Sequence, residues 1–309
     1  MTRDHGAMGD ATGDGTITWR RLWTETAAVV GGRSAGRWLC EAACGLDGDE
    51  FLDALDEPAT ERMVAHLDAM LARWRSGEPL QYVLGRWGFR RLDLLVDRRV
   101  LIPRPETEML VDVVLDVLGP SARPHRIADL GTGSGAIGLA LADELPLGSV
   151  EVWLTDVSDD ALDVARANLA GIGRRGSHVR LARGSWFDAL VPELAGTFDV
   201  VVSNPPYVED DDPEVESIVR EWEPSTALFA GADGLDAVRV IAASVGEWLR
   251  PGGTVVMEIG ASQGGRAAAL LRDGGLVDVE VRPDHAGRDR VVIGRRRADP
   301  RRPARGHAG

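Results

Sequence analysis

From Arg126 onward, short apolar runs rich in β-branched residues alternate with segments of helical periodicity. Runs without polar alternation predict strands buried on both faces, and strands that alternate with helices predict a doubly wound sheet. Seven strands are expected, near residues 127–130, 150–155, 179–182, 198–203, 254–259, 277–281 and 290–293. We therefore predict an α/β fold that binds its ligand beyond the carboxyl ends of parallel strands.

The composition limits the size of the fold and the chemistry open to it. A chain of 309 residues has room for one large domain and a small one, and 44% hydrophobic residues support a packed core. The formal net charge of −14 disfavours extended contact with nucleic-acid phosphates. All 35 basic residues are arginine, which excludes a lysine Schiff base or a lysine general base.

Nothing in the sequence indicates a metal site, a disulfide framework or a membrane span. Cys40 and Cys44 are the only thiols and lie one helical turn apart, so we interpret them as helix-packing residues. The sequence shows no apolar run long enough to cross a membrane and no secretory leader. We expect a cytoplasmic protein without a bound metal.

The first part of the chain is predicted to be helical. Residues 16–77 show helical periodicity and contain four of the nine tryptophans, which favours a small helical domain. Ser34 is expected to cap its second helix, and Pro58 to open a longer helix that ends at Gly77. Residues 78–100 change to short β-prone runs broken by glycines, which predicts a hairpin linker.

This linker is expected to lead into the α/β domain at residues 101–297. The compositions of residues 1–15 and 298–309 are typical of a disordered leader and a disordered basic tail.

A glycine-rich loop follows the first strand of the expected sheet. The run Gly131-Thr132-Gly133-Ser134-Gly135 has the spacing of a cofactor-binding loop, because glycines let the backbone approach a ligand without a Cβ clash. Asp156 ends the next strand, about 20 residues downstream, where an acid accepts hydrogen bonds from ribose hydroxyls. The loop and the acid together allow either a nicotinamide enzyme or an S-adenosylmethionine enzyme.

The fourth expected strand runs directly into Asn204-Pro205-Pro206-Tyr207. Proline fixes its own φ and disfavours the helical region for the residue before it, so this segment should be extended just past the strand. The prolines offer carbonyls without N–H donors, and the Asn204 side chain adds a further acceptor oxygen. Such acceptors suit a substrate NH2 group. A hydride-transfer site would need a proton relay or a metal, so the tetrapeptide favours S-adenosylmethionine as the cofactor.

The tetrapeptide resembles that of methyltransferases acting on planar NH2 nitrogens, namely glutamine side chains, adenine N6 and cytosine N4. Over about residues 18–295, the sequence resembles the peptide chain release factor glutamine N5-methyltransferase family. The matching segments are 77–85, Leu101-Ile102-Pro103-Arg104-Pro105-Glu106-Thr107-Glu108, 129–135, 204–207 and Glu258-Ile259-Gly260.

The resemblance implies a small N-terminal helical domain for substrate recognition, a hairpin linker and a seven-stranded, Rossmann-like methyltransferase domain. It implies methylation of the glutamine in the Gly-Gly-Gln motif of class 1 release factors, with S-adenosylmethionine as cofactor. Residues 131–135 would wrap the amino-acid and ribose portion of the cofactor, Asp156 would hold the ribose hydroxyls, and Trp186 would lie against the adenine.

The tetrapeptide would hold the substrate amide beside the cofactor. Asn204 Oδ1 and the Pro205 carbonyl would accept hydrogen bonds from the amide NH2 group, with Asn204 positioned between the two ligands. Pro206 would complete the rigid segment, and Tyr207 would pack on the flat amide.

Other functions stay open at this point. A family that methylates a ribosomal-protein glutamine shares the tetrapeptide, but the run 101–108 favours the release-factor branch. A DNA amino-methyltransferase is disfavoured because residues 209–223 contain eight acidic residues and only Arg220 as a cation, and because no extra target-recognition domain is visible. The simpler interpretation of this acidic loop is a solvated surface. A non-enzymatic binding module is the remaining alternative.

Overall fold

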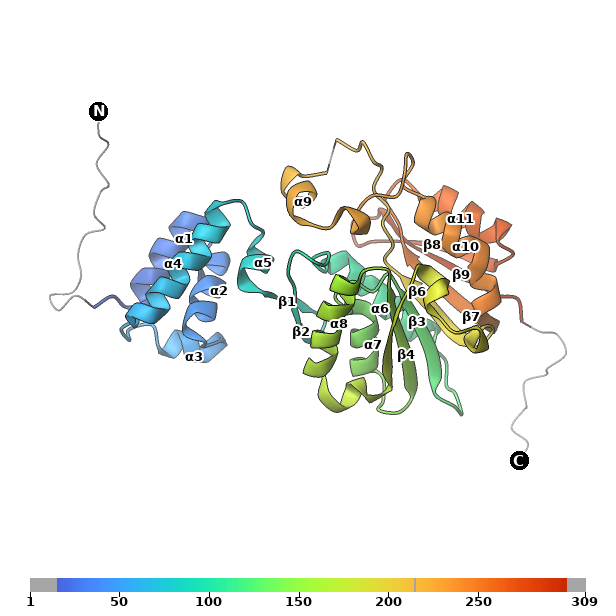
Figure 1. Cartoon of the computed structure of the whole chain (residues 1–309), viewed down its shortest axis with the longest axis horizontal. Helices are drawn as coiled ribbons and strands as arrows, with labels where there is room; N and C mark the ends of the chain where they lie inside the picture. Colours follow the sequence, from blue (N-terminus) through green and yellow to red (C-terminus); the bar gives the residue numbers. More distant parts are fainter. Residues whose placement is uncertain (1–15, 214, 299–309) are drawn as a thin grey trace. The chain divides into compact units, whose positions relative to one another are not determined.

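The computed structural model describes residues 16–213 and 215–298, and the chain forms two compact units that divide between Gly85 and Arg86. Figure 1 shows helices alone in the first unit, and a sheet covered by helices in the second. The expected leader at 1–15 and all but the first residue of the expected tail lie outside the described residues.

The first unit is helical, as the periodicity predicts. Its core gathers Phe51, Leu39 and Leu67, and Trp19 meets Phe51 edge to face at 6.2 Å between ring centroids. Cys40 lies in this core, where burial raises the pKa of its thiol to about 12. The helices are α1 Trp19–Val30, α2 Arg33–Cys44, α3 Gly48–Asp53, α4 Glu61–Arg75 and α5 Leu80–Leu84.

Two of the predicted helix starts are wrong. Helix α2 begins at Arg33 after an N-cap at Gly32, two residues earlier than a Ser34 cap would allow. Helix α4 begins after Thr60, whose hydroxyl accepts a hydrogen bond from the Met63 N–H at 3.3 Å. A hydroxyl that satisfies a free N–H is the better start, and Pro58 instead pairs with Thr18 in an isolated β-bridge.

The segment predicted as a hairpin linker is only partly β. Residues 80–84 form helix α5, in which Val83 is buried and Leu80 and Leu84 pack against the core of the first unit. Apolar burial at helical spacing outweighs the β propensity of this stretch. The hairpin follows, with β1 Arg86–Phe89 paired antiparallel to β2 Leu92–Leu95.

The second unit contains a seven-stranded sheet in the order β5-β4-β3-β6-β7-β9-β8. Pairing is parallel from β5 to β7 and antiparallel where β9 meets β7 and β8, so the last strand of the chain inserts between two earlier ones. The strands are β3 His125–Leu130, β4 Val150–Asp156, β5 Val179–Arg183, β6 Phe198–Ser203, β7 Leu249–Glu258, β8 Val277–Pro283 and β9 Asp289–Arg295. The predicted doubly wound sheet is confirmed.

Helices cover both faces of this sheet (Figure 1). Successive residues of β6 enter opposite cores, with Val200 and Val202 packing on one side and Val201 on the other, which is why the strand is apolar throughout. Helices α6 and α7 supply the first core, and α10 and α11 the second. The helices of this unit are α6 Glu108–Val117, α7 Ala136–Glu144, α8 Asp159–Gly171, α9 Ser217–Trp222, α10 Asp236–Trp248 and α11 Gly264–Asp273.

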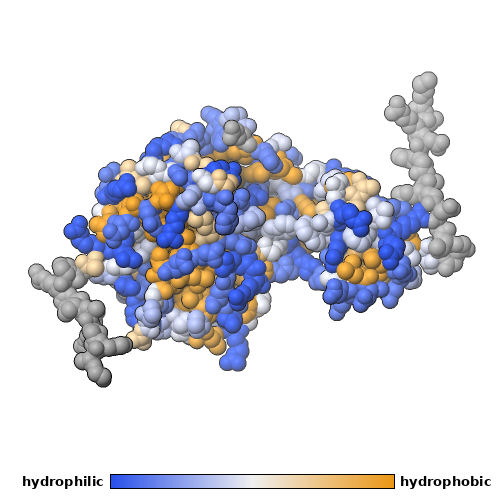
Figure 2. Space-filling view, turned by 180° about the vertical axis from the view of Figure 1, so that it is seen from behind, coloured by the Kyte–Doolittle hydropathy of each residue, from blue (hydrophilic) through white to orange (hydrophobic). Residues whose placement is uncertain are grey.

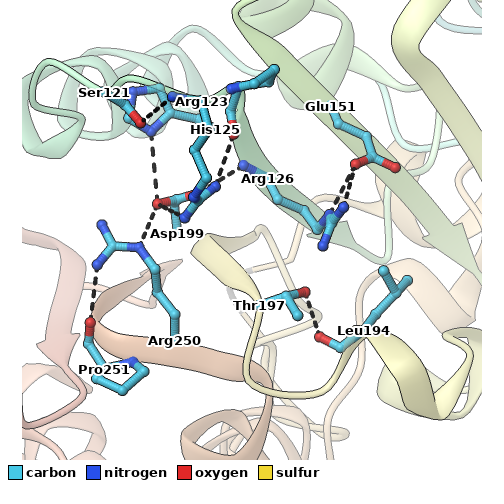
Figure 3. Close-up of polar contacts among 11 residues, drawn as sticks. Ser121, Arg123, His125, Arg126, Glu151, Leu194, Thr197, Asp199, Arg250 and Pro251 are labelled. Atoms are coloured by element: carbon cyan, nitrogen blue, oxygen red, sulfur yellow. Dashed lines mark hydrogen bonds and ion pairs between the residues drawn. The ribbon is translucent and has the colours of Figure 1, made fainter. Parts of the chain in front are cut away.

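The amino end of β6 is held by ion pairs around Asp199, a carboxylate whose side chain is only 2% exposed (Figure 3). It accepts hydrogen bonds from the Arg126 N–H at 2.8 Å and from the guanidinium groups of Arg123 and Arg250. Burial alone would raise the pKa of Asp199, but these hydrogen bonds hold it below its usual value.

Across residues 16–213 and 215–298, every helix is too short or too polar to cross a bilayer. In the space-filling view, hydrophilic residues cover much of the visible face, with hydrophobic residues scattered between them (Figure 2).

Candidate active site

The sheet positions the site at the point where its strand order reverses. After β3 the chain adds β4 and β5 on one side, then returns to place β6 on the other side of β3. The glycine loop follows β3, and the tetrapeptide follows β6. Neighbouring parallel strands therefore bring residues 131–135 and 204–207 together at one edge of the sheet.

The glycine loop has a backbone that other residues would not adopt without strain. Gly131, Gly133 and Gly135 all have positive φ, at 67°, 55° and 86°. A Cβ on Gly131 would also lie 3.4 Å from the Trp186 ring, so the missing side chain leaves room above the loop. Gly135 instead serves the turn, because its Cβ would collide with Leu139 at 2.8 Å as helix α7 begins.

Asp156 is held beside this loop by backbone donors. Its Oδ2 accepts from the Gly133 N–H at 3.0 Å, and its Oδ1 accepts from the Ser158 N–H at 2.9 Å. Each carboxylate oxygen can accept a further hydrogen bond, so the side chain is fixed and can still bind a ligand hydroxyl.

A first cavity of about 210 Å³ opens over the loop. Most of the predicted cofactor residues line it, namely Gly131, Thr132, Gly133, Ser134, Asp156, Trp186 and Asn204. Gly135 is not among the lining residues, so its predicted contact with the cofactor is replaced by the turn role described above.

Asp129 is a buried carboxylate directly beneath the loop. Its Oδ2 accepts from the Thr132 hydroxyl at 2.7 Å and from the Gly138 N–H at 3.0 Å, while its Oδ1 is buried without a partner among the described residues. Burial, countered by these two hydrogen bonds, raises the pKa of Asp129 to about 6. The carboxylate fastens the loop to the start of α7 at an electrostatic cost.

A second cavity, of about 330 Å³, adjoins the first. Asn204 lines both cavities, whereas Tyr207 lines the second and Pro206 the first. Pro205 is buried and lines neither cavity, so the predicted contact of its carbonyl with a ligand stays a prediction. Asn204 is thus the member of the tetrapeptide that two neighbouring ligands could both reach.

Thr107 and Glu258 also belong to this centre, although the sequence analysis assigned neither of them a role in it. The Thr107 hydroxyl donates to Glu258 Oε2 at 2.8 Å and accepts from Asn204 Nδ2 at 3.1 Å. The Tyr207 hydroxyl donates to Glu258 Oε1 at 3.2 Å. Glu258 is an acid at the carboxyl end of a parallel strand, as Asp156 is, and that position was the available signal.

The simpler interpretation, that the acidic segment 209–223 is a solvated surface, does not hold for the end of this segment. Glu223 is 5% exposed, and its carboxylate accepts from Arg104 at 2.5 Å and from the Ile102 N–H at 3.3 Å. Burial raises the pKa of Glu223, and Arg104 opposes this shift. The ion pair ties the end of the loop to the segment 101–108, beside the second cavity, which Arg104 lines.

Family models match a segment in each of the two units. A family model described as the methyltransferase small domain matches residues 107–222, and one described as the PrmC N-terminal domain matches residues 27–85. A solved structure of a release-factor-specific protein-(glutamine-N5) methyltransferase from Alicyclobacillus acidocaldarius is 28% identical, covers 63% of this chain and 94% of that chain, and has a TM-score of 0.39.

Curated relatives match most of the chain. The release factor glutamine methyltransferase of Xylella fastidiosa is 43% identical over 78% of this chain and 84% of its own length. The protein of the same name from Agrobacterium fabrum is 37% identical over 93% of this chain and 99% of its own length. With identities of this size over nearly whole relatives, the chain belongs to the release factor glutamine methyltransferase family.

Proposed function

We propose that this protein transfers a methyl group from S-adenosylmethionine to the side-chain amide nitrogen of the glutamine in the Gly-Gly-Gln motif of class 1 release factors. The observation that carries the proposal is the position of Asn204, which lines two adjoining cavities. One cavity has the features of a nucleoside-cofactor site, and the other is open to a second ligand.

The residues of the first cavity fit S-adenosylmethionine. The absent side chain of Gly131 leaves space beside Trp186, and Asp156 offers carboxylate oxygens to ribose hydroxyls. Trp186 provides an aromatic face for the adenine. When bound, this cofactor supplies an electrophilic methyl group on a positively charged sulfur.

The second cavity would receive the glutamine side chain. An amide nitrogen is a weak nucleophile because its lone pair is delocalised into the carbonyl. Asn204 Oδ1 and the Pro205 carbonyl would accept hydrogen bonds from the two N–H groups, which aims the nitrogen and stabilises the positive charge that grows on it. Correct orientation of the amide nitrogen toward the methyl group would be the larger contribution, since orientation can be worth roughly 7–11 kcal/mol. The methylated nitrogen would then release one proton to water, which restores a neutral amide. Tyr207, which lines this cavity, would pack on the amide plane.

The second cavity does not favour a nucleic-acid substrate. Its single cation, Arg104, is already paired with Glu223, and Glu216 also lines the cavity. A phosphate backbone would meet acidic side chains here without a free cation among the lining residues. This disfavours DNA and supports a peptide substrate.

Two further parts of the proposal concern the rest of the chain. We assign recognition of the release factor to the helical unit that ends at Gly85, because the methyltransferase site is complete within the second unit. We also place the protein in the cytoplasm, where release factors meet the ribosome.

The direct test incubates the protein with methyl-labelled S-adenosylmethionine and, in separate reactions, a class 1 release factor, the same factor with its Gly-Gly-Gln glutamine replaced by alanine, and duplex DNA. We expect label in the intact factor alone, with mass spectrometry locating the methyl group on that glutamine. Label in DNA, or equal label in both forms of the factor, would refute the proposal.

A further inference from the structure

We propose that Thr107 and Glu258 are positioning residues that fix the rotation of the Asn204 amide, so that Oδ1 and not the NH2 group faces the substrate. This inference rests on the proposed function, since it concerns how the same centre holds a substrate amide. It explains why three segments far apart in the sequence meet behind Asn204.

The arrangement begins with a buried acceptor. Glu258 is 1% exposed, and its two carboxylate oxygens face two hydroxyl groups, Thr107 at 2.8 Å and Tyr207 at 3.2 Å. Burial raises the pKa of Glu258, and the Thr107 hydrogen bond, the charge of Arg290 and the Tyr207 hydrogen bond oppose this shift. In its ionised form the carboxylate carries no hydrogen, so each hydroxyl donates to it. The one hydrogen of the Thr107 hydroxyl is therefore committed to Glu258.

Because its hydrogen is committed, the Thr107 oxygen can only accept from its other neighbour. That neighbour is Asn204, whose Nδ2 lies 3.1 Å away and donates. If the amide rotated by half a turn, Asn204 Oδ1 would face the Thr107 oxygen with no hydrogen between them. The repulsion between these two oxygens and the loss of the hydrogen bond both oppose that rotation. The described residues donate no hydrogen bond to Oδ1 in the observed orientation, so it is left to accept from a ligand.

The three groups are held by rigid backbone. Thr107 is 3% exposed and ends the 3₁₀ turn Pro105–Thr107 before α6, and Glu258 ends β7, an interior strand of the sheet. The carbonyl of Tyr207 is held in turn by the Gln263 amide at 2.9 Å. None of these supports depends on a flexible surface side chain, so the amide orientation is set before a substrate arrives.

The test measures kcat, KM and cofactor affinity for the full-length protein and for Thr107→Val and Thr107→Ser, with a release factor as substrate. Valine keeps the shape of threonine and removes the hydroxyl, whereas serine keeps the hydroxyl. We expect Thr107→Val to lower kcat by about ten- to a hundredfold. Thr107→Ser should recover most of that loss, with the dissociation constant for S-adenosylmethionine changing little in either variant. If valine impairs folding, Thr107→Ala replaces it.

A double-mutant cycle separates positioning through Asn204 from a general structural effect. If Thr107 acts through Asn204, adding Thr107→Val to Asn204→Ala lowers kcat no further than Asn204→Ala alone. Losses that multiply, or a valine variant with the parental kcat, would overturn the inference. Parental activity on the release factor is measured in the same assay, so absence of that activity would count against the proposed function itself.

Discussion

The two ends of strand β6 use polar groups in opposite ways. At the amino end, Asp199 is saturated by one backbone N–H and two guanidinium groups (Figure 3). At the carboxyl end, the Asn204 amide donates one hydrogen bond to Thr107, and the described residues donate none to its oxygen. Asn204 lines two cavities that could hold two ligands. A buried strand can therefore carry a stability site and a reaction site five residues apart, at Asp199 and Asn204. The two sites differ in whether their polar groups keep unused hydrogen-bonding capacity.

The comparison predicts that damage at the carboxyl end affects rate and not stability. Asn204→Ala should lower kcat for methyl transfer by about 10²–10³-fold, because an acceptor aimed at developing charge is lost. The dissociation constant for S-adenosylmethionine should stay within roughly tenfold, equivalent to about 1.4 kcal/mol. Single-turnover kinetics and titration calorimetry measure the two quantities. A variant with a near-parental rate would show that Asn204 does not hold the substrate amide.

Damage at the amino end should have the reverse effect. Asp199→Ala leaves the Arg126 N–H without its acceptor and brings Arg123 and Arg250 together without a counter-charge. Both guanidinium groups are at least 40% exposed and can rehydrate, so we expect a loss of about 2–3 kcal/mol in the free energy of unfolding. Urea unfolding measures this loss. Methyl transfer per folded molecule should be unchanged, and a fall in kcat would mean that the two ends are coupled.

Two buried aspartates near opposite ends of the neighbouring strands β3 and β6 should respond to pH with opposite signs. The lowered pKa of Asp199 adds stability that is present above about pH 4 and is lost as the pH falls further. The pKa of Asp129 is raised to about 6, so the folded state binds the extra proton and loses stability as the pH rises through that value.

The Asp129→Asn variant isolates this second effect. Its stability relative to the parent should increase by about 1 kcal/mol between about pH 5 and pH 7.5, because only the parent then ionises a buried carboxyl. Urea unfolding of both proteins at the two pH values gives the difference. A relative stability that is constant or that falls with rising pH would contradict the burial argument for Asp129.

The smallest effect is expected beside Asp199, at an ion pair that is open to solvent. Arg126 pairs with Glu151 at 2.8 Å, with both side chains 30% exposed (Figure 3). Glu151→Gln should cost less than about 1 kcal/mol, since such pairs are screened by water. Thermal or urea unfolding measures the loss, and Asp199→Ala, measured in the same experiment, is the matched comparison. An equal loss in both variants would mean that burial does not distinguish the two carboxylates.

Local sequence patterns predicted the parts of the site that are encoded locally. Strand β6 is observed at residues 198–203, as the run of valines indicates, and the glycine loop has the positive φ values that only glycine adopts freely. Several residues that line the first cavity could be predicted in the same way. A strand, the glycine loop after it and the acid at the end of the next strand can each be recognised from a short stretch of sequence.

The parts that sequence reasoning missed depend on contacts between distant segments. Thr107 lies 97 residues before Asn204, and Glu258 lies 151 residues after Thr107, so no local pattern joins them. Glu223 was interpreted as a solvated acid because its partner, Arg104, comes from 119 residues earlier. The predicted hairpin was wrong at residues 80–84 for the same reason, because packing of Val83 in the first unit decided that these residues form a helix.

A crystal structure of the protein with S-adenosylhomocysteine and a peptide carrying the Gly-Gly-Gln motif tests the central claim most directly. The account predicts the glutamine amide nitrogen within about 3 Å of Asn204 Oδ1 and of the Pro205 carbonyl, with the nucleoside in the first cavity against Trp186. A glutamine amide bound elsewhere, or an Asn204 amide that presents its NH2 group to the peptide, would contradict it.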